Sequence, residues 1–77
     1  MRELMERIVK QIVDNPDQVV VHEIKGEGSS LLEISTAKED MGKVVGKGGR
    51  IANALRTIMG AVAAKNKKRV VVEILEK

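Results

Sequence analysis

The chain has 77 residues, a formal net charge of +3, no cysteine and no Phe, Tyr or Trp. This length suits one small domain with an aliphatic core, and the lack of cysteine excludes disulfides and thiolate metal sites. A charged N-terminal stretch excludes a signal peptide, and no apolar run is long enough to span a membrane, so we expect a cytoplasmic protein.

The charged residues are distributed unevenly along the chain. Residues 1–40 carry five basic and nine acidic side chains, whereas residues 41–72 carry eight basic side chains and no acidic one. A basic block of this kind is typical of a surface that binds a polyanion. The alternative is a basic surface that only keeps the protein soluble, and the glycine-rich motif inside the block favours the first interpretation.

The first predicted element is an amphipathic helix near the N-terminus. Its apolar side chains recur at helical spacing: Leu4, Met5, Ile8, Val9, Ile12 and Val13. The polar face carries charges of both signs, which favours packing against the core over binding at a membrane surface. Pro16 ends the helix, because the residue before a proline is pushed out of the α region.

Two short strands follow. Residues 19–24 are rich in β-branched side chains, and residues 31–35 form a second strand in which Leu32 and Ile34 face inward. The short turn between them predicts an antiparallel hairpin. His22 is the only histidine and has no ligand or catalytic partner nearby in the sequence, so it is interpreted as structural or solvated.

The second half of the chain predicts two helices and a final strand. Thr36 and Glu39 have the spacing of a capping box, which would begin a short helix that Gly46 ends. A longer helix covers residues 50–64 and has five apolar side chains at helical spacing: Ile51, Leu55, Ile58, Met59 and Val62. Residues 69–75 form the third strand. The order α-β-β-α-α-β predicts a two-layer α+β fold with a three-stranded mixed sheet and three helices on one face.

The segment at residues 44–51 contains three glycines and two cations. Gly46, Gly48 and Gly49 permit positive φ and close approach to the main chain, and Lys47 and Arg50 add positive charge. The helix that follows offers unpaired N–H groups and the positive end of its dipole. The spacing fits neither a P-loop nor a dinucleotide fingerprint, because Arg50 and Ile51 follow the last glycine. A sugar-phosphate backbone is therefore the expected ligand.

A helix, Gly-x-x-Gly and a second helix are the hallmark of the KH domain, whose loop clamps about four nucleotides. Residues 44–51 resemble the KH core, and the order of elements resembles the type II arrangement found in bacteria. With residues 14–17, 39–47 and 68–73, the whole chain resembles the small stand-alone bacterial KH proteins of the KhpA family. Residues 1–77 are accordingly expected to form a single KH domain.

The resemblance implies single-stranded RNA binding in a shallow groove, as an RNA chaperone or a post-transcriptional regulator. The loop glycines and Lys47 would meet the RNA backbone, and aliphatic side chains of the flanking helices would form the groove floor. The expected RNA-binding residues are Lys43, Val45, Gly46, Lys47, Gly48, Gly49, Arg50, Ile51 and Leu55. The family's variable loop corresponds to residues 26–30 and is short. The second inner loop position is Gly48, where many KH loops carry a basic residue.

The composition also predicts how RNA would be bound. Without aromatic side chains, bases cannot stack on aromatic platforms, which elsewhere contribute about 1–3 kcal/mol per base. Affinity must come from phosphate charge, loop N–H groups and aliphatic contacts. We therefore expect weak, salt-dependent binding with low sequence selectivity.

Two other classes of function compete with RNA binding. An enzyme is not expected, because the sequence shows no paired-carboxylate site, no cysteine and one isolated histidine; catalytic residues, metal ions, cofactors and a small-molecule substrate are not expected either. A protein-interaction module is the more serious alternative, since the Ala-rich helix at residues 50–64 could present an apolar face. The KhpA resemblance implies self-association and pairing with a larger KH-containing RNA-binding protein of the KhpB (Jag) type through the helix-GxxG-helix.

Overall fold

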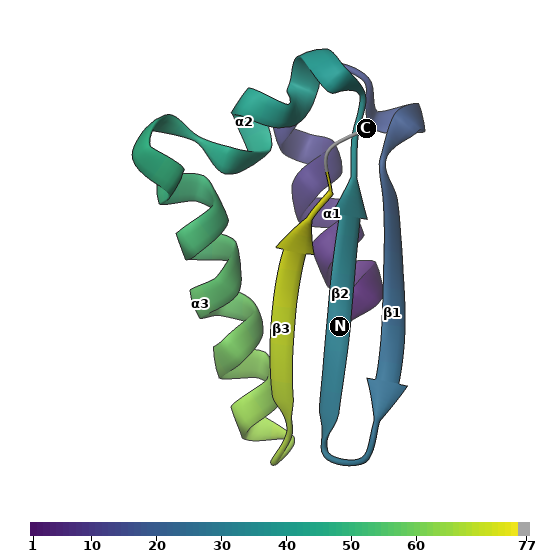
Figure 1. The fold of residues 1–77 in the computed structure, drawn as a ribbon, viewed down its shortest axis with the longest axis vertical. Coiled ribbons are helices and arrows are strands. Elements are labelled where there is room, and N and C mark those ends of the chain that lie inside the picture. Colours follow the sequence, from purple (N-terminus) through teal and green to yellow (C-terminus); the bar gives the residue numbers. More distant parts are fainter. Residues whose placement is uncertain (76–77) are drawn as a thin grey trace.

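The computed structural model describes residues 1–75, and its element order matches the order predicted from the sequence (Figure 1). The elements are α1 (Arg2–Ile12), β1 (Val20–Gly26), β2 (Ser29–Ser35), α2 (Met41–Val45), α3 (Arg50–Lys65) and β3 (Arg69–Ile74). Short 3₁₀ turns lie at Pro16–Gln18, Lys38–Asp40 and Lys47–Gly49. Within the described residues, no helix is long and apolar enough to cross a membrane.

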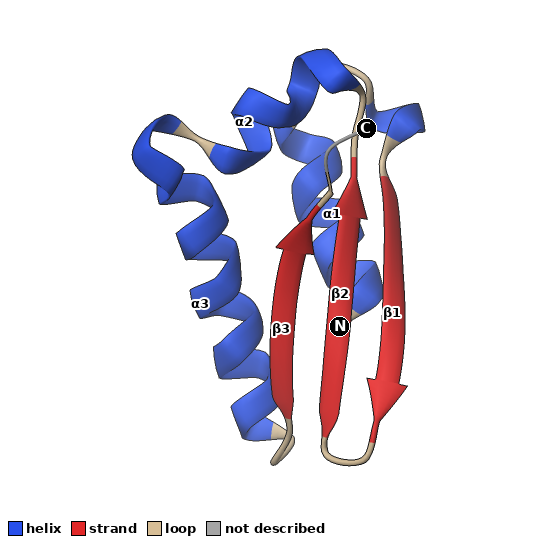
Figure 2. Cartoon of the chain, viewed as in Figure 1, coloured by secondary structure: helices blue, strands red, loops and turns tan. Residues whose placement is uncertain are grey.

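The three strands form a mixed sheet in the order β1-β2-β3 (Figure 2). β1 and β2 pair antiparallel from Val20–Ser35 to Gly26–Ser29, so the hairpin turn is tighter than the predicted one. Gly28 has φ +68°, a conformation that glycine adopts without steric cost. β3 runs parallel to β2, which confirms the mixed sheet and its helical crossover.

The core lies on one face of the sheet. Side chains of α1, α2 and α3 meet the inward face of the strands in one cluster of buried aliphatic residues: Met5, Val9, Val13, Val19, Val21, Leu32, Ile34, Val44, Leu55, Met59 and Val72. The opposite face of the sheet leaves Ile24 and Val71 more than half exposed. The fold is therefore the predicted two-layer α+β arrangement with its three helices on one face.

Asp40 holds the start of α2 against the end of α1. Its carboxylate is fully buried and accepts hydrogen bonds from the backbone N–H groups of Asp14 (3.2 Å) and Asn15 (3.0 Å). The Asn15 side-chain amide adds a third hydrogen bond of 3.0 Å. These donors belong to the residues that follow α1, where the chain leaves the helix and needs acceptors.

The predicted capping box is wrong. The hydroxyl of Thr36 is buried and donates to the carbonyl of Ala37, while the carboxylate of Glu39 accepts a hydrogen bond from Asn15. The 3₁₀ turn at Lys38–Asp40 precedes α2, and no side chain caps either element. The start of α2 is held by long-range hydrogen bonds to Asp40 rather than by the predicted local cap.

The inward face of α3 differs slightly from the predicted one. Ala52, Leu55, Met59 and Ala63 are buried, as helical spacing requires for a single face. Ile58 was expected to face inward but is 43% exposed. Its position falls on the outer side of α3, next to the exposed Ala54 and Ala61.

Candidate nucleic-acid interface

The bend between α2 and α3 projects away from the sheet (Figure 1). Gly46 ends α2 with φ +78° and ψ 170°, and its N–H donates to the carbonyl of Gly42 at 2.8 Å. Gly48 (φ +66°) and Gly49 (φ +78°) then reverse the chain into α3. Three positive φ angles within four residues explain why glycines stand at these positions.

Gly46 is fixed by space as well as by its backbone angles. A methyl group on its Cα would lie 2.7 Å from Cγ1 and 2.8 Å from the backbone nitrogen of Ile51. At Gly48 the same methyl group would meet nothing within 4 Å. The loop thus has one end packed tightly against α3 and an inner position open to solvent.

The loop and the start of α3 together form a positive surface. Lys47 and Arg50 are exposed, and the first turn of α3 contains no acidic residue. The first N–H groups of a helix have no acceptor within that helix, and the dipole of the 16-residue α3 adds partial positive charge here. The N–H groups of Gly49 and Arg50 already donate to the carbonyls of Gly46 and Lys47. Exposed cations and the remaining N–H groups at a helix start are the groups that bind a phosphate.

The structure brings most of the predicted binding residues together. Val45, Gly46, Lys47, Gly48, Gly49, Arg50 and Ile51 are consecutive around the bend. Val45 and Ile51 are half-buried, so each keeps part of its side chain at the surface. Leu55 is only 2% exposed and belongs to the core beneath the loop.

Lys43 is held differently from Lys47. Its ammonium group forms an ion pair with Asp14 and lies 3.9 Å from Oδ1 of Asp40. The hydrogen bond with Asp14 is the largest cause of a raised pKa of Lys43; desolvation, the next largest effect, lowers it, and the charges of Asp14 and Asp40 raise it. Its charge is therefore largely compensated, whereas no ion pair is found for Lys47 or Arg50 among residues 1–75.

The carboxylate of Asp40 is stabilised in its charged form. Burial alone would raise its pKa, but the hydrogen bonds from Asn15 and from the backbone of Asp14, with the nearby Lys43 ammonium, outweigh burial and lower the pKa below its ordinary value. Asp40 and Asn15 were not singled out from the sequence. No local pattern marks this contact, because its hydrogen bonds join positions 25 and 26 residues apart.

A polar stripe on α3 continues from the loop. Gly49, Asn53, Arg56 and Gly60 follow one another at spacings of three or four residues and so share one side of the helix. Arg56 donates to the carbonyl of Val72 in β3 at 3.4 Å and to Oδ1 of Asn53 at 3.2 Å. The stripe therefore lies on the side of α3 that faces β3. From the sequence, Arg56 is recognisable only as one of the eight cations of residues 41–72.

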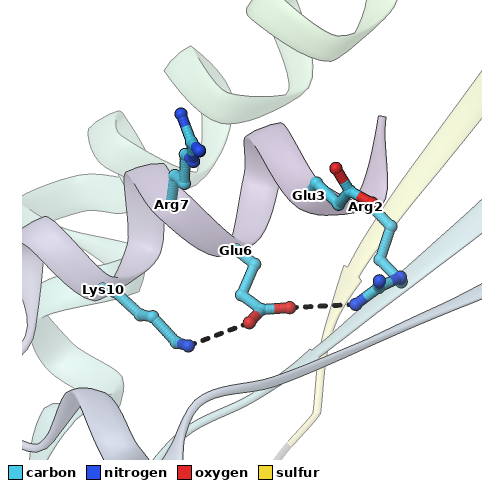
Figure 3. A pocket seen from close by; sticks show the side chains of 5 residues that line it. All are labelled: Arg2, Glu3, Glu6, Arg7 and Lys10. Carbon is cyan, nitrogen blue, oxygen red and sulfur yellow. Dashed lines mark hydrogen bonds and ion pairs between the residues drawn. The ribbon is translucent and has the colours of Figure 1, made fainter.

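A hollow on α1 offers a contrast. It is lined by Arg2, Glu3, Glu6, Arg7 and Lys10, and Figure 3 shows the Glu6 carboxylate between the cationic ends of Arg2 and Lys10. Both ion pairs measure 2.9 Å. The hydrogen bond with Lys10 is the main cause of a lowered pKa of Glu6. Two of its three cations, Arg2 and Lys10, already share the Glu6 carboxylate, so the hollow is a poor anion site.

Comparison with known proteins gives one consistent result. The family model of the KhpA/KhpB KH domain matches residues 2–74. A protein of Clostridium acetobutylicum named RNA-binding protein KhpA is 57% identical over 75 residues, covering 97% of this chain and all of that relative. Proteins of the same name from Borreliella burgdorferi and Aquifex aeolicus are 50% and 49% identical, over 90% and 96% of their own lengths and at least 96% of this chain. No solved structure gives a significant match.

Proposed function

This chain belongs to the KhpA/KhpB family of KH domains, and on that premise we propose that it binds single-stranded RNA through the Gly46–Gly49 loop. KH domains are nucleic-acid-binding modules rather than enzymes, so membership in this family confirms the expectation that the chain is not an enzyme. Residues 1–77 would act as one RNA-binding unit, as a chaperone or a post-transcriptional regulator. Because RNA is a cytoplasmic ligand in bacteria, the proposed site of action is the cytoplasm.

One observation carries the proposal. The loop is a projecting bend of nearly bare main chain, at the positive end of α3, between two exposed cations that have no carboxylate partner in residues 1–75. A phosphodiester is the ligand that such a bend fits, since the glycines let its oxygens reach the backbone N–H groups. The absence of aromatic side chains limits base stacking, so we propose low sequence selectivity.

The proposed contact residues differ in how much each would contribute to RNA binding. Lys47, Gly48, Gly49 and Arg50 would meet phosphates, and Gly46 would fix the path of the loop. Val45 and Ile51 would meet ribose or base with their exposed parts. Lys43 would contribute less, because Asp14 and Asp40 compensate its charge. Leu55 would support the groove from below, because almost none of its side chain reaches the surface.

A paired substitution tests the loop directly. The variant Lys47→Asp/Gly48→Asp places two carboxylates where phosphate is proposed to bind, and aspartate tolerates the left-handed conformation at position 48. We expect the affinity for a four-nucleotide uridylate, measured by NMR titration, to fall by about tenfold or more. Unchanged affinity in the folded variant would contradict the proposal.

The hairpin turn supplies a matched control. Lys25→Asp/Gly28→Asp makes the same two changes in a turn whose glycine has φ +68° and open space around it. This turn lies at the end of the strands opposite the loop (Figure 1). We expect the control variant to bind the tetranucleotide within about twofold of the unchanged protein, which would separate a local effect from a general effect of net charge.

A second candidate function is protein pairing through the outer side of α3. Ala54, Ile58 and Ala61 are exposed at helical spacing, and a half-exposed isoleucine between two alanines is suited to close helix contact. We propose self-association, or pairing with a larger KH-containing protein of the KhpB type, as a further use of this helix. Sedimentation over a concentration series tests it: Ile58→Asp should abolish any dimer, and a strict monomer at high concentration would exclude self-association.

A further inference from the structure

A second group of cations lies at the far end of α3. Lys65 is the last residue of the helix, Lys67 and Lys68 follow in the turn, and Arg69 begins β3. We call residues 65–69 the basic exit turn. All five residues are exposed, and within residues 1–75 none of its four cations forms an ion pair.

The basic exit turn is rigidly built. The N–H of Lys68 donates to the carbonyl of Ala63 at 2.8 Å, and the N–H of Lys67 donates to Ala64 at 3.0 Å. These two bonds are those of a Schellman motif, which ends a helix with one left-handed residue. The N–H of Arg69 donates to Gly28 at 2.9 Å and ties the turn to the β1–β2 hairpin, which adds Lys25 and one carboxylate, Glu27, to this end of the molecule.

Lys67 occupies a position that normally belongs to glycine. Its φ of +57° makes it the single non-glycine residue with positive φ among the described residues. The left-handed conformation is unfavourable for a lysine, and the Schellman motif uses glycine here in most helices. The negative end of the helix dipole explains a cation in the last turn, such as Lys65. It does not explain Lys67, which lies beyond the helix in an unfavourable backbone conformation. A conformational cost that persists at one residue points to a functional reason.

The two positive ends are connected by a helix without acidic residues. The chain has no Asp or Glu between residues 41 and 72, and the stripe of Asn53, Arg56 and Gly60 runs along the β3 side of α3 between the loop and the basic exit turn. Sixteen helical residues span about 24 Å. At a rise of about 3.4 Å per stacked nucleotide, about seven nucleotides cover that distance, and fewer suffice for an extended strand.

We propose that the basic exit turn is a second phosphate-binding site, which contacts the same RNA strand after it has passed along the β3 side of α3 from the Gly46–Gly49 loop. The inference rests on the proposed binding at that loop. In this arrangement the Gly46–Gly49 loop binds short RNA segments, and the basic exit turn binds the additional phosphates of longer segments. The protein then distinguishes RNAs by the length of unpaired strand rather than by sequence.

The experiment compares a four-nucleotide with a twelve-nucleotide uridylate. In the variant Lys65→Gln/Lys67→Gly/Lys68→Gln, three charges are removed and position 67 receives the residue that its backbone favours, so the fold is retained. We expect affinity for the twelve-mer to fall about tenfold and the slope of log K against log salt to fall by about 2, since each single-strand phosphate contributes about 0.7. Affinity for the four-mer should stay within about twofold.

The matched control removes three exposed cations elsewhere. Arg2→Gln/Arg7→Gln/Lys10→Gln lowers the net charge equally, but on α1, and should leave the binding of the twelve-mer within about twofold. Equal losses in the two triple variants, or equal losses for the two RNAs, would overturn the inference. The loop could still bind RNA in that case, and the Lys47→Asp/Gly48→Asp variant would still lose both RNAs. If that loop variant loses neither RNA, the proposed function fails and this inference fails with it.

Lys67 alone gives a second test, which measures stability and RNA binding in one variant. Lys67→Gly should raise Tm, because glycine relieves the left-handed strain, and should lower affinity for the twelve-mer about two- to threefold. Opposite changes in stability and binding would mark a residue retained for binding. A higher Tm with unchanged affinity for the twelve-mer would show that the strain serves no RNA contact, and would contradict the role given to Lys67.

Discussion

The two ends of α2 are built in opposite ways, although only five residues separate them. At the start of α2, a fully buried carboxylate takes three hydrogen bonds from the segment after α1. At its end, three glycines with positive φ carry the chain through an exposed bend. At one end the buried carboxylate is hydrogen-bonded inside the protein, and at the other the cations of Lys47 and Arg50 have no carboxylate partner within residues 1–75.

The buried start of α2 explains how the glycine-rich loop at its other end can keep a defined shape. Glycines would normally cost much backbone entropy on binding. Here the anchor at Asp40 fixes the position of α2, and the contact between Gly46 and Ile51 fixes the direction in which the chain leaves it. The proposed binding surface is thus exposed and yet largely set before a ligand arrives, which reduces the cost of ordering it.

The largest expected effect comes from closing the space at Gly46. Gly46→Ala places a methyl group against Ile51 in a backbone conformation that alanine avoids, so we expect a loss of about 2–4 kcal/mol in the free energy of unfolding. Gly48→Ala meets only the left-handed backbone and should cost about 1–2 kcal/mol. Urea denaturation of both variants measures this, and equal losses would show that the contact with Ile51 does not fix the loop.

The next effect comes from the buried end of α2. Asp40→Asn keeps the shape of the side chain but replaces one acceptor oxygen with a donor that faces backbone N–H groups, so we expect Tm to fall by about 5–10 °C at pH 7. Glu39→Gln is the control, because its carboxylate contacts the same Asn15 side chain at the surface. A Tm of Asp40→Asn equal to that of the control would argue against the anchor.

Acid should weaken the same end of α2. The pKa of Asp40 is lower in the folded protein than its ordinary value of 3.8, so its stabilisation is present above that value and is lost as the pH falls through the lower folded pKa. Stability should therefore decrease as the pH falls from about 5 to about 3, and the decrease should be smaller in Asp40→Asn. The variant Glu6→Gln on α1 should show most of the acid-induced decrease in stability that the unchanged protein shows. Thermal unfolding at several pH values provides the comparison.

The smallest expected effect separates two lysines that lie four residues apart. Lys47→Gln should reduce the slope of log K against log salt for RNA by about 0.7, because one phosphate contact is lost. Lys43→Gln should change that slope less and lower Tm by under about 5 °C, since its ammonium group is exposed and already paired with carboxylates. An equal effect on RNA binding would mean that Lys43 leaves Asp14 to bind phosphate.

Much of the fold was predictable from local patterns. Period-3.6 and period-2 repeats located the helices and strands, and the short hairpin and the long helical crossover fixed their pairing as antiparallel and parallel. The loop was predictable as well, because glycines stand at the positions where the backbone has positive φ. These features depend on residues that are neighbours in the sequence.

The features that were missed depend on distant residues. Asp40 bonds to residues 25 and 26 positions away, and Lys43 pairs with a carboxylate 29 positions away. The capping box failed for this reason, since Glu39 found a partner in Asn15 rather than in its own helix. Helical spacing also could not decide whether Ile58 lies on the inner or outer flank of α3, because that depends on how the helix rotates against the sheet.

An NMR titration of the ¹⁵N-labelled protein with a four-nucleotide uridylate shows which backbone amides meet the RNA. If the loop binds the strand, the largest shift changes will fall on the amides of residues 47–51 and will weaken as salt is raised, and the amides of Asp14 and Asn15 at the other end of α2 will move little. Unmoved loop amides, with the largest changes elsewhere in the protein, would contradict binding by the loop.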